Sequence, residues 1–247
     1  HSYESNKCDS RSNQYCLLIH HDCWEAHECF QTNGQKTSPM PTPKGTPFWW
    51  EDAKQHLRHV DPEIGRIIDC VEEPSLIGEG DIVRTICNAV VGQQISAIAA
   101  DAIWKRLLDY CGGTFDPEPI RKITEDDLKQ IGISRSKGRT LAGVAAISER
   151  LQDIEWSKMS SEEVVGELLP LWGIGPWTIN MVRIFSLLDP DILPVNDIGV
   201  VRCIEAIEGR APLELEEIEL RAEIWKPYRT CAVWYLWRQH DESPVQY

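Results

Sequence analysis

An aspartate late in the chain stands alone in an apolar segment. In "DILPVNDIGVVR" (residues 191–202), Asp197 follows Asn196 and leads into an apolar helical pattern that begins near Ile198. A carboxylate at the wall of a dry pocket can stabilise a positive charge that develops in a reaction, and can orient an attacking water. The same side chain can cap the following helix, and the two roles are compatible because a capping carboxylate is held in a fixed direction. Asn196 cannot supply the charge.

A glycine-rich turn lies about twenty residues before this aspartate. In "LPLWGIGPWTINMVRIF" (residues 169–185), Gly173 and Gly175 precede Pro176, whose missing N–H costs little in the first turn of a helix. Glycine permits positive φ angles and lets another backbone come close. The amide N–H groups of such a helix N-terminus suit a phosphate, so the turn could hold nucleic acid without Lys or Arg. The alternative is that the turn only joins two helices, the second over residues 176–188.

The segments that must position these residues have helical patterns from residue 48 onward. Apolar residues recur every three or four positions over residues 82–107, with an interruption at residues 92–94. Ser134 and Ser160 each stand before a further apolar pattern, and Ser160 has a glutamate in capping-box spacing. No segment alternates convincingly between apolar and polar residues as a strand would. The sequence therefore predicts an all-α protein of short helices.

Length and charge set limits on the chain as a whole. It has 247 residues, of which 42% are apolar, so it can bury a substantial core. It contains no run of about eighteen apolar residues that could span a membrane. Its first residues do not show a cationic segment followed by an apolar core and a cleavage site, so we do not expect secretion. A net charge of −14 argues against nonspecific binding to polyanions, and the chain stays strongly acidic without its first 39 residues.

Residues 1–46 differ from the rest of the chain. Residues 1–39 are polar, show no helical or strand periodicity, and are followed by Met40 and a linker rich in proline. We expect residues 1–39 to be a disordered extension, or upstream sequence translated from a misplaced start. Residues 47–247 are then the folded domain.

The cysteines are unevenly distributed. Five are scattered singly through helical patterns, where Cys behaves as a small buried hydrophobe. The other four crowd the extension, and their spacing lacks the close CxxC pairing of most zinc sites, so reduced thiols are the simpler interpretation. These four are Cys8, Cys16, Cys23 and Cys29.

The motifs together resemble one known family. Residues 169–185 resemble the helix-hairpin-helix of the DNA base-excision glycosylases, and residues 191–202 resemble the segment that carries their catalytic aspartate; together these are the HhH-GPD signature. Residues 82–107 and 128–145 are similar to upstream helices of the 3-methyladenine DNA glycosylase II (AlkA-like) branch. The resemblance covers residues 48–240. It implies two helical lobes with the active-site cleft between them, without the extra N-terminal β domain of some members.

The resemblance assigns roles to residues of these motifs. Asp197 matches the family's catalytic carboxylate. Trp177 stands where the bifunctional glycosylase/lyases have a Schiff-base lysine, and since Trp cannot form a Schiff base, a monofunctional hydrolase is implied. Trp177 and Trp237 match aromatic positions of the base pocket, whose ring faces would attract a cationic purine, and Met181 is expected on the same face. The alternative for both tryptophans is core packing.

Further residues are expected at the DNA. Gln94 falls where family members insert a wedge side chain into the gap left by the flipped nucleotide, although a polar loop between helices explains it equally well. Gly173, Gly175 and Thr178 are expected at the DNA backbone, and the two glycine carbonyls would frame the monovalent cation, Na⁺ or K⁺, that the family binds. The four-cysteine cluster of endonuclease III relatives is missing, since only Cys231 lies there, so no iron–sulfur cluster and no other cofactor is expected.

Two further groups are expected from the sequence. One is a basic cluster that could neighbour DNA phosphates, although three basic residues in five are also typical of a solvated face. It comprises Arg135, Lys137 and Arg139. The other group comprises aromatic residues expected in the core, namely Trp172, Tyr228 and Trp234.

The residues and the resemblance together predict a monofunctional DNA glycosylase that flips out and hydrolytically excises alkylated purines, of the 3-methyladenine and 7-methylguanine class, in base excision repair. Two alternatives stay open: a glycosylase for another damaged base, and a non-catalytic HhH DNA-binding module in which Asp197 is only a cap. The expected partner is double-stranded DNA with damaged bases. We expect a monomer, without membrane contact, at the nucleoid in the bacterial cytoplasm or in the nucleus of a eukaryote.

Overall fold

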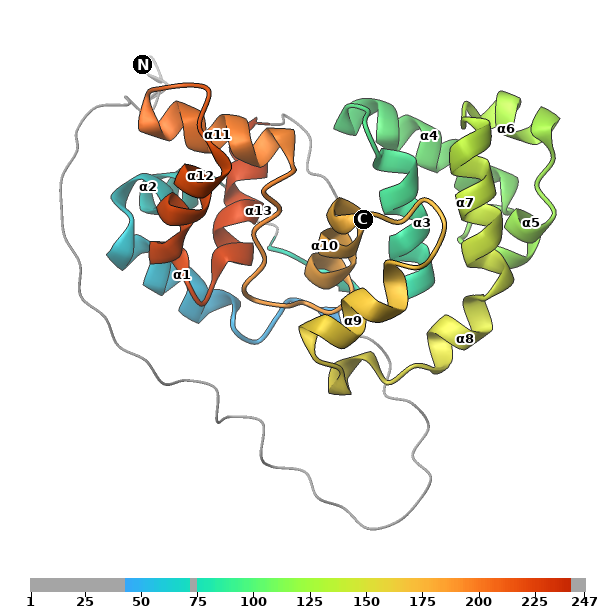
Figure 1. The fold of residues 1–247 in the computed structure, drawn as a ribbon, viewed down its shortest axis with the longest axis horizontal. Helices are drawn as coiled ribbons and strands as arrows, with labels where there is room; N and C mark the ends of the chain where they lie inside the picture. The colour runs from blue at the N-terminus through green and yellow to red at the C-terminus, as the bar shows by residue number, and fades with distance from the viewer. Residues whose placement is uncertain (1–42, 72–74, 241–247) are drawn as a thin grey trace, which may run out of the picture. The chain divides into compact units, whose positions relative to one another are not determined.

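The computed structural model describes residues 43–71 and 75–240, and these are mostly helical (Figure 1). The helices are α1 (Trp50–Val60), α2 (Pro62–Cys70), α3 (Ile82–Gly92), α4 (Ala97–Tyr110), α5 (Pro117–Arg121), α6 (Glu125–Ile131), α7 (Arg135–Ala146), α8 (Ser148–Asp153), α9 (Ser161–Leu168), α10 (Pro176–Phe185), α11 (Ile198–Glu208), α12 (Leu215–Ala222) and α13 (Arg229–His240). Two short 3-10 turns are η1 (Trp156–Lys158) and η2 (Glu223–Trp225). The all-α prediction is confirmed. The extension predicted for residues 1–39, with its four cysteines, lies outside the described residues.

Helix α10 contributes to two hydrophobic cores. Met181 and Phe185 pack into the core of α1, α2 and α11–α13. Ile179 and Val182, on the other side of the same helix, pack into the core of α3–α9. Figure 1 shows α10 between these two groups of helices. The two lobes predicted from the resemblance are therefore built around one shared helix, and this helix also carries Trp177.

Side-chain caps begin helices where the sequence predicts them. Ser134 Oγ accepts the N–H of Lys137 at the start of α7. Ser160 and Glu163 form a reciprocal capping box at the start of α9. Each cap satisfies amide N–H groups that the first turn of a helix leaves without an intrahelical partner. Asp197 occupies the same position for α11.

Helix α10 ends at Phe185, three residues earlier than predicted. Leu188 has a left-handed φ of 52°, and its carbonyl accepts the indole N–H of Trp49 at 3.0 Å. Because Trp49 lies 139 residues away in sequence, helical periodicity alone cannot reveal this contact. The early end releases the chain into the segment that leads to Asp197.

The described residues include one short strand pair, which the sequence does not predict. β1 (Lys44–Gly45) pairs antiparallel with β2 (Gly78–Glu79), so that Lys44 faces Glu79. Strands of two residues are too short to show an alternating pattern. The pair attaches residues 44 and 45, which the sequence assigned to the linker, to the folded helices.

A buried carboxylate joins α2 to α12 and η2. Asp61 is only 2% exposed and caps α2 by accepting the N–H groups of Glu63 and Ile64. Its Oδ2 also accepts hydrogen bonds from Arg221 Nη2 at 2.6 Å and from Trp225 Nε1 at 2.7 Å. These donors offset the cost of burying a charge. The network stabilises the lobe on which α11 and α13 stand.

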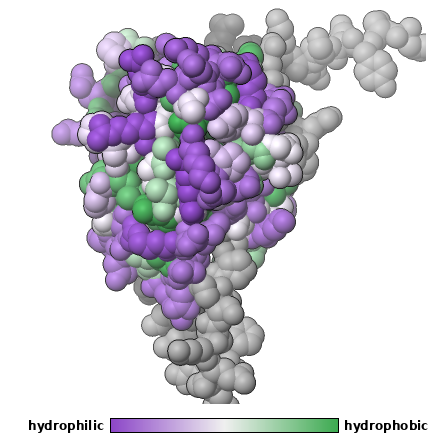
Figure 2. Space-filling view, turned by 90° about the vertical axis from the view of Figure 1, so that its right-hand side faces the viewer, coloured by the Kyte–Doolittle hydropathy of each residue, from purple (hydrophilic) through white to green (hydrophobic). Residues whose placement is uncertain are grey.

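Hydrophilic residues cover much of the face that Figure 2 shows, with apolar residues in smaller patches. Acidic residues gather in first turns, as in α6, where Glu125, Asp126 and Asp127 lie beside the positive end of the helix dipole. Part of the chain's negative charge is therefore placed where helices favour it.

Within residues 43–71 and 75–240, no helix combines the length and the apolarity needed to cross a membrane.

Candidate active site

Two indole side chains and one backbone N–H converge on Asp197, which is half-buried at the N-cap of α11. Its Oδ1 accepts the backbone N–H of Val200 at 3.0 Å, as a capping residue does. Trp237 Nε1 donates to the same oxygen at 3.0 Å, and Trp177 Nε1 donates to Oδ2 at 2.8 Å. A cap requires only the Val200 contact. The two indole donors therefore give this carboxylate an environment that capping does not explain.

The two tryptophans reach Asp197 from different helices. Trp177 lies in the first turn of α10 and is half-buried, whereas Trp237 lies in α13 and is only 7% exposed. The Trp237 ring stacks on Phe185, with centroids 5.9 Å apart and planes at 13°. Met181, one turn after Trp177, is fully buried in the core of this lobe. The structure thus brings three of the predicted residues together, while a pocket wall formed by Met181 stays a prediction.

The hydrogen bonds leave the Asp197 carboxylate with free acceptor capacity on one side. An ionised carboxylate offers about four lone-pair sites over its two oxygens. Oδ1 accepts two of the three bonds and Oδ2 accepts one. The remaining site therefore lies on Oδ2, where a water could be held. Because the carboxylate is fixed from three directions, its negative charge keeps one orientation, which is what stabilisation of a developing cation requires.

The segment that leads to Asp197 is tied to the start of α13. Arg229 binds Asp191 through Nε at 2.6 Å and through Nη2 at 2.9 Å. Thr230 Oγ1 donates to the carbonyl of Asp189 at 2.6 Å and accepts the N–H of Ile192 at 2.9 Å. The sequence did not single out Arg229 or Thr230. In the sequence they are a charged residue and a hydroxyl residue at the start of a helix. Such a pair is too common to indicate a functional role.

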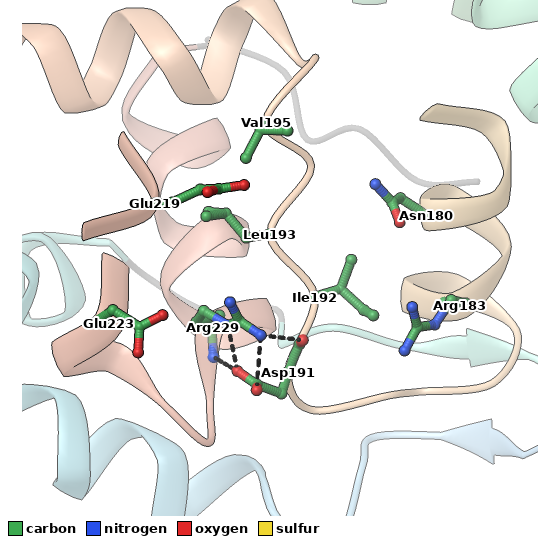
Figure 3. A pocket seen from close by; sticks show the side chains of 9 residues that line it. All are labelled: Asn180, Arg183, Asp191, Ile192, Leu193, Val195, Glu219, Glu223 and Arg229. Carbon is green, nitrogen blue, oxygen red and sulfur yellow. Dashed lines mark hydrogen bonds and ion pairs between the residues drawn. The ribbon is translucent and has the colours of Figure 1, made fainter. Parts of the chain in front are cut away.

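A pocket of about 250 Å³ opens beside this segment (Figure 3). It is lined by Asn180, Arg183, Asp191, Ile192, Leu193, Val195, Glu219, Glu223 and Arg229. The arginines are engaged with carboxylates, Arg229 with Asp191 and Arg183 with Asp189, the latter at 2.6 Å. Asp197 and the two tryptophans do not line this pocket. It is therefore distinct from the base pocket that the sequence predicts, although it borders the same segment.

The two glycines of the hairpin have different environments. Gly173 has a φ of 76°, and a Cβ built there would overlap Thr140 Oγ1 on α7. Gly175 is the N-cap of α10 with an extended φ of −117°, and a Cβ there would meet nothing within 4 Å. Gly173 is thus required by backbone conformation and close packing. Gly175 is not, and its small size leaves open space before the N–H groups of α10, which have no side-chain cap.

The wedge loop between α3 and α4, residues 93–96, contacts the hairpin through Gln93. Gln93 Nε2 donates to the carbonyl of Gly173 at 3.0 Å and to Thr178 Oγ1 at 2.9 Å. Gln94 is exposed and has a left-handed φ of 57°. Thr178 is 1% exposed and its hydroxyl accepts the Gln93 amide, so a DNA contact of this residue stays a prediction. The resemblance assigned a role to Gln94 alone, and the structure adds the contact of Gln93 with the hairpin.

The predicted cation ligands fit the structure only in part. The carbonyl of Gly173 already accepts an amide N–H from Gln93, and a donor beside a cation is electrostatically unfavourable. No position in the described ranges brings three or more His, Cys, Asp or Glu side chains together to hold a metal ion. The carbonyl of Gly175 accepts the N–H of Ile179 within α10. The hairpin carbonyls are therefore engaged within the protein.

The basic cluster of α7 does not act as a unit. Lys137 turns inward, where its Nζ donates to the carbonyls of Val91 and Gln93, and burial lowers its pKa. Arg135 forms an exposed ion pair with Glu125 at 3.0 Å. The expectation that all three basic residues neighbour phosphates is thus weakened for Lys137, which is engaged within the protein.

Arg139, the third member of this cluster, lies against the hairpin. Its guanidinium lies over the Trp172 ring, 3.9 Å from the centroid. Trp172 is 59% exposed, so the prediction that it belongs to the core is wrong, whereas Trp234 is buried as predicted. Trp172 directly precedes Gly173 in the turn and packs into neither of the two cores.

A family model for HhH-GPD superfamily base excision DNA repair proteins matches residues 87–229, more than half of the chain. The chain belongs to the HhH-GPD superfamily. The matched region runs from α3 to the start of α13 and contains the hairpin, Trp177 and Asp197. Membership agrees with the resemblance and with the two-lobed fold.

Two of the relatives are named as 3-methyladenine DNA glycosylases. A DNA-3-methyladenine glycosylase of Bacillus subtilis is 30% identical over 178 residues, which are 66% of this chain and 58% of that protein. DNA-3-methyladenine glycosylase 1 of Schizosaccharomyces pombe is 32% identical over 159 residues, which are 62% of this chain and 70% of that protein. The chain thus matches less than two thirds of the Bacillus protein's length.

Solved structures show the same fold. The S. pombe 3-methyladenine DNA glycosylase Mag1 in complex with abasic DNA superposes with a TM-score of 0.69 at 27% identity, over 76% of this chain and 95% of Mag1. An 8-oxoguanine glycosylase/lyase of Clostridium acetobutylicum superposes with a TM-score of 0.61 at 16% identity, over 77% of this chain and 70% of that chain. The second likeness concerns the fold alone.

Proposed function

We propose that this HhH-GPD protein is a monofunctional DNA glycosylase that hydrolyses the N-glycosidic bond of alkylated purines and leaves an abasic site. The observation that carries the proposal is the Asp197 carboxylate held by two indole N–H groups and one backbone N–H. The relatives named as 3-methyladenine glycosylases support the substrate class. A DNA-binding module would need the hairpin but not this arrangement around a carboxylate.

The reaction follows from the fixed carboxylate. The N-glycosidic bond breaks with its electron pair leaving on the base, and a cationic alkylated purine leaves as a neutral molecule without being protonated. The negative charge of Asp197 stabilises the oxocarbenium-like sugar that forms. A water held at Oδ2 then adds its oxygen to C1′ and loses a proton to the carboxylate or to bulk water. No covalent enzyme intermediate is required.

Trp177 supports the monofunctional assignment. A lyase step in this superfamily would use an amine at this position, and an indole cannot form a Schiff base. Instead, the Trp177 N–H edge is directed at Oδ2, so the ring lies beside the reacting sugar. A ring face next to a carboxylate attracts a cationic base by cation–π and electrostatic terms together. This combination favours positively charged alkylpurines over neutral bases.

DNA binding is assigned to the hairpin and the wedge loop. The open space at Gly175 lets a phosphate approach the N–H groups at the start of α10. Gln94 enters the gap that the flipped nucleotide leaves, where it holds the open state. Backbone N–H groups bind an anion without added positive charge, which suits an acidic chain. The proposed substrate is therefore double-stranded DNA that contains damaged bases.

The deciding experiment measures release of 3-methyladenine and 7-methylguanine from methylated duplex DNA by the wild type and by Asp197→Asn. Strand breaks are scored in the same samples before and after alkali. We expect base release by the wild type, strand breaks only after alkali, and loss of release in Asp197→Asn. Asn196→Ala, at the exposed neighbouring position, serves as the control that should release both bases.

Two results would argue against the proposal. Release that persists in Asp197→Asn would remove the catalytic role from this carboxylate. A wild type that binds the DNA but releases neither base would favour the binding module, or another lesion. Thermal unfolding of each variant separates loss of chemistry from loss of fold.

A further inference from the structure

The wedge loop is held from both of its sides. On one side, Lys137 Nζ from α7 donates to the carbonyl of Val91 at 2.8 Å and to that of Gln93 at 2.8 Å. On the other side, the Gln93 side chain donates to the hairpin at Gly173 and Thr178. Gln94 stands between these anchors with its side chain exposed.

We propose that Lys137 and Gln93 are positioning residues that hold Gln94 ready to enter the DNA stack. The inference rests on the proposed function, in which Gln94 is the wedge. Neither residue need touch the DNA. Lys137 acts on the backbone of the loop, and Gln93 couples the loop to the hairpin that grips a phosphate.

The conformation of Gln94 requires such support. A residue other than glycine is strained in the left-handed region, so the contacts around the loop have to hold Gln94 in this conformation. Gln93 and Gln94 follow the C-terminal end of α3, where carbonyls lack intrahelical partners. The Lys137 ammonium satisfies two carbonyls at this negative end of the helix dipole. Its side chain is withdrawn from bulk water to do so, and the pKa of Lys137 is lowered accordingly.

The Gln93 contact makes the loop respond to the hairpin. Its amide bridges the Gly173 carbonyl in the turn and the Thr178 hydroxyl in the first turn of α10. A phosphate bound at the start of α10 therefore lies at a fixed distance from the wedge. The protein therefore fixes the distance between the bound phosphate and the site where Gln94 enters the base stack before DNA binds. Less conformational entropy is then lost when the complex forms.

The test compares one lesion in two contexts. A single 7-methylguanine is placed in a fully paired duplex and in a short bubble of noncomplementary bases, where extrusion costs less and a wedge matters less. We expect Lys137→Met and Gln93→Ala to raise the ratio of bubble to duplex excision by about tenfold, as Gln94→Ala does. Lys137→Arg, which keeps donors, should partly restore the wild-type ratio. Lys129→Met, at an exposed lysine paired with Asp126, is the matched control.

A double variant shows whether Lys137 acts through Gln94. Lys137→Met combined with Gln94→Ala should be no worse in the duplex than Gln94→Ala alone, because contributions of coupled residues are not additive. Additive losses, or losses that are equal in duplex and bubble, would mean that Lys137 only supports the fold and would overturn the inference.

A readout without catalysis separates this inference from the proposed function. 2-Aminopurine placed at the lesion position brightens when it leaves the stack. Wild-type protein should raise this fluorescence on binding, and Lys137→Met and Gln93→Ala should raise it less at saturating protein. A wild type that brightens the probe but releases no methylated base would contradict the proposed reaction only. Variants that brighten it as fully as the wild type would overturn the positioning role.

Discussion

The indole N–H of Trp237 lies 3.0 Å from Oδ1 of Asp197, across 40 residues of sequence. Hydrogen bonds to charged groups contribute about 1.5–3 kcal/mol, and this one also fixes the carboxylate that must face the sugar. Trp237→Phe keeps an aromatic ring on Phe185 but removes the donor. We expect the kcat for excision to fall by about 10- to 100-fold, with a smaller change in KM.

Trp234→Phe is the matched control for this change. Trp234 lies one turn earlier in α13, is equally buried, and contacts Phe185 edge-on at 6.2 Å. Trp234 donates no hydrogen bond to Asp197, whose described partners are Trp177, Trp237 and Val200, so its replacement should lower the melting temperature about as much and leave kcat near the wild-type value. Equal losses of kcat in both variants would show that packing of α13, not the hydrogen bond, matters.

Substitutions at the two hairpin glycines should separate stability from DNA binding. Gly173→Ala places a methyl group against Thr140 and strains a positive φ, so we expect a loss of about 2–4 kcal/mol of unfolding free energy. Gly175→Ala meets open space at an extended backbone and should change stability by less than about 0.5 kcal/mol. Its methyl group would stand where a phosphate approaches α10. Denaturant unfolding and DNA titration of both variants check this, and normal DNA affinity in Gly175→Ala would count against the phosphate site.

The Arg229 and Asp191 pair should couple to activity through the segment it anchors. Both side chains are mostly shielded, with exposed fractions of 20% and 28%, and the contact is bidentate. We expect Arg229→Met to cost about 1–3 kcal/mol of stability and to lower kcat, because the segment that carries Asp197 loosens.

A double-mutant cycle with Asp191→Asn measures this pair directly. Partners in contact typically show coupling energies of about 0.5–3 kcal/mol. Additive effects in the double variant would mean that the ion pair does not stabilise the segment, and that Thr230 alone anchors it.

The sequence predicts the helices, their caps and the identity of the central carboxylate because these depend on local patterns. Capping by Ser134 and Ser160 is encoded within four residues, and the start of α11 follows from Asp197 and the apolar pattern after it. The fold class and the superfamily follow from the order of such patterns along the chain. These features can be predicted without knowing which helices pack against each other.

Contacts between distant residues could not be predicted in this way. Gln93 and Thr178 are 85 residues apart, and Arg229 and Asp191 are 38 apart. The sequence of one helix predicts phosphate contacts for Lys137 but cannot reveal that its ammonium donates to two carbonyls at the end of α3. Trp172 was expected in the core because tryptophan is apolar. Whether its side chain faces the core or the solvent depends on how the turn packs, which the sequence does not show. Side-chain roles of this kind require the tertiary structure.

Arg139 should contribute to DNA affinity through its position on Trp172. The guanidinium stacks on the exposed ring at 3.9 Å and keeps its N–H edge free of the ring. If it meets one phosphate, Arg139→Ala should reduce the slope of log K against log salt by about 0.9 for duplex DNA. Arg135→Ala, which removes a residue paired with Glu125, should leave the slope unchanged. An unchanged slope in Arg139→Ala would assign the stacked pair to hairpin stability instead.

Trp177→Lys tests whether position 177 faces the reacting carbon. The Trp177 indole nitrogen lies 2.8 Å from Asp197 Oδ2, so a lysine amine at this position can reach the sugar that Asp197 faces. An amine there can condense with the aldehyde of an abasic site, with loss of water, and borohydride then reduces the Schiff base to a stable crosslink. We expect crosslinking to abasic DNA by Trp177→Lys but not by the wild type or by Trp177→Met, which matches the lysine stem without an amine. Hydrolytic base release should fall in both variants, because each loses the aromatic ring that attracts the cationic base. If Trp177→Lys binds abasic DNA without crosslinking, C1′ does not lie within reach of residue 177. Asp197, which is hydrogen-bonded to Trp177, would then not lie beside C1′ in the way proposed here.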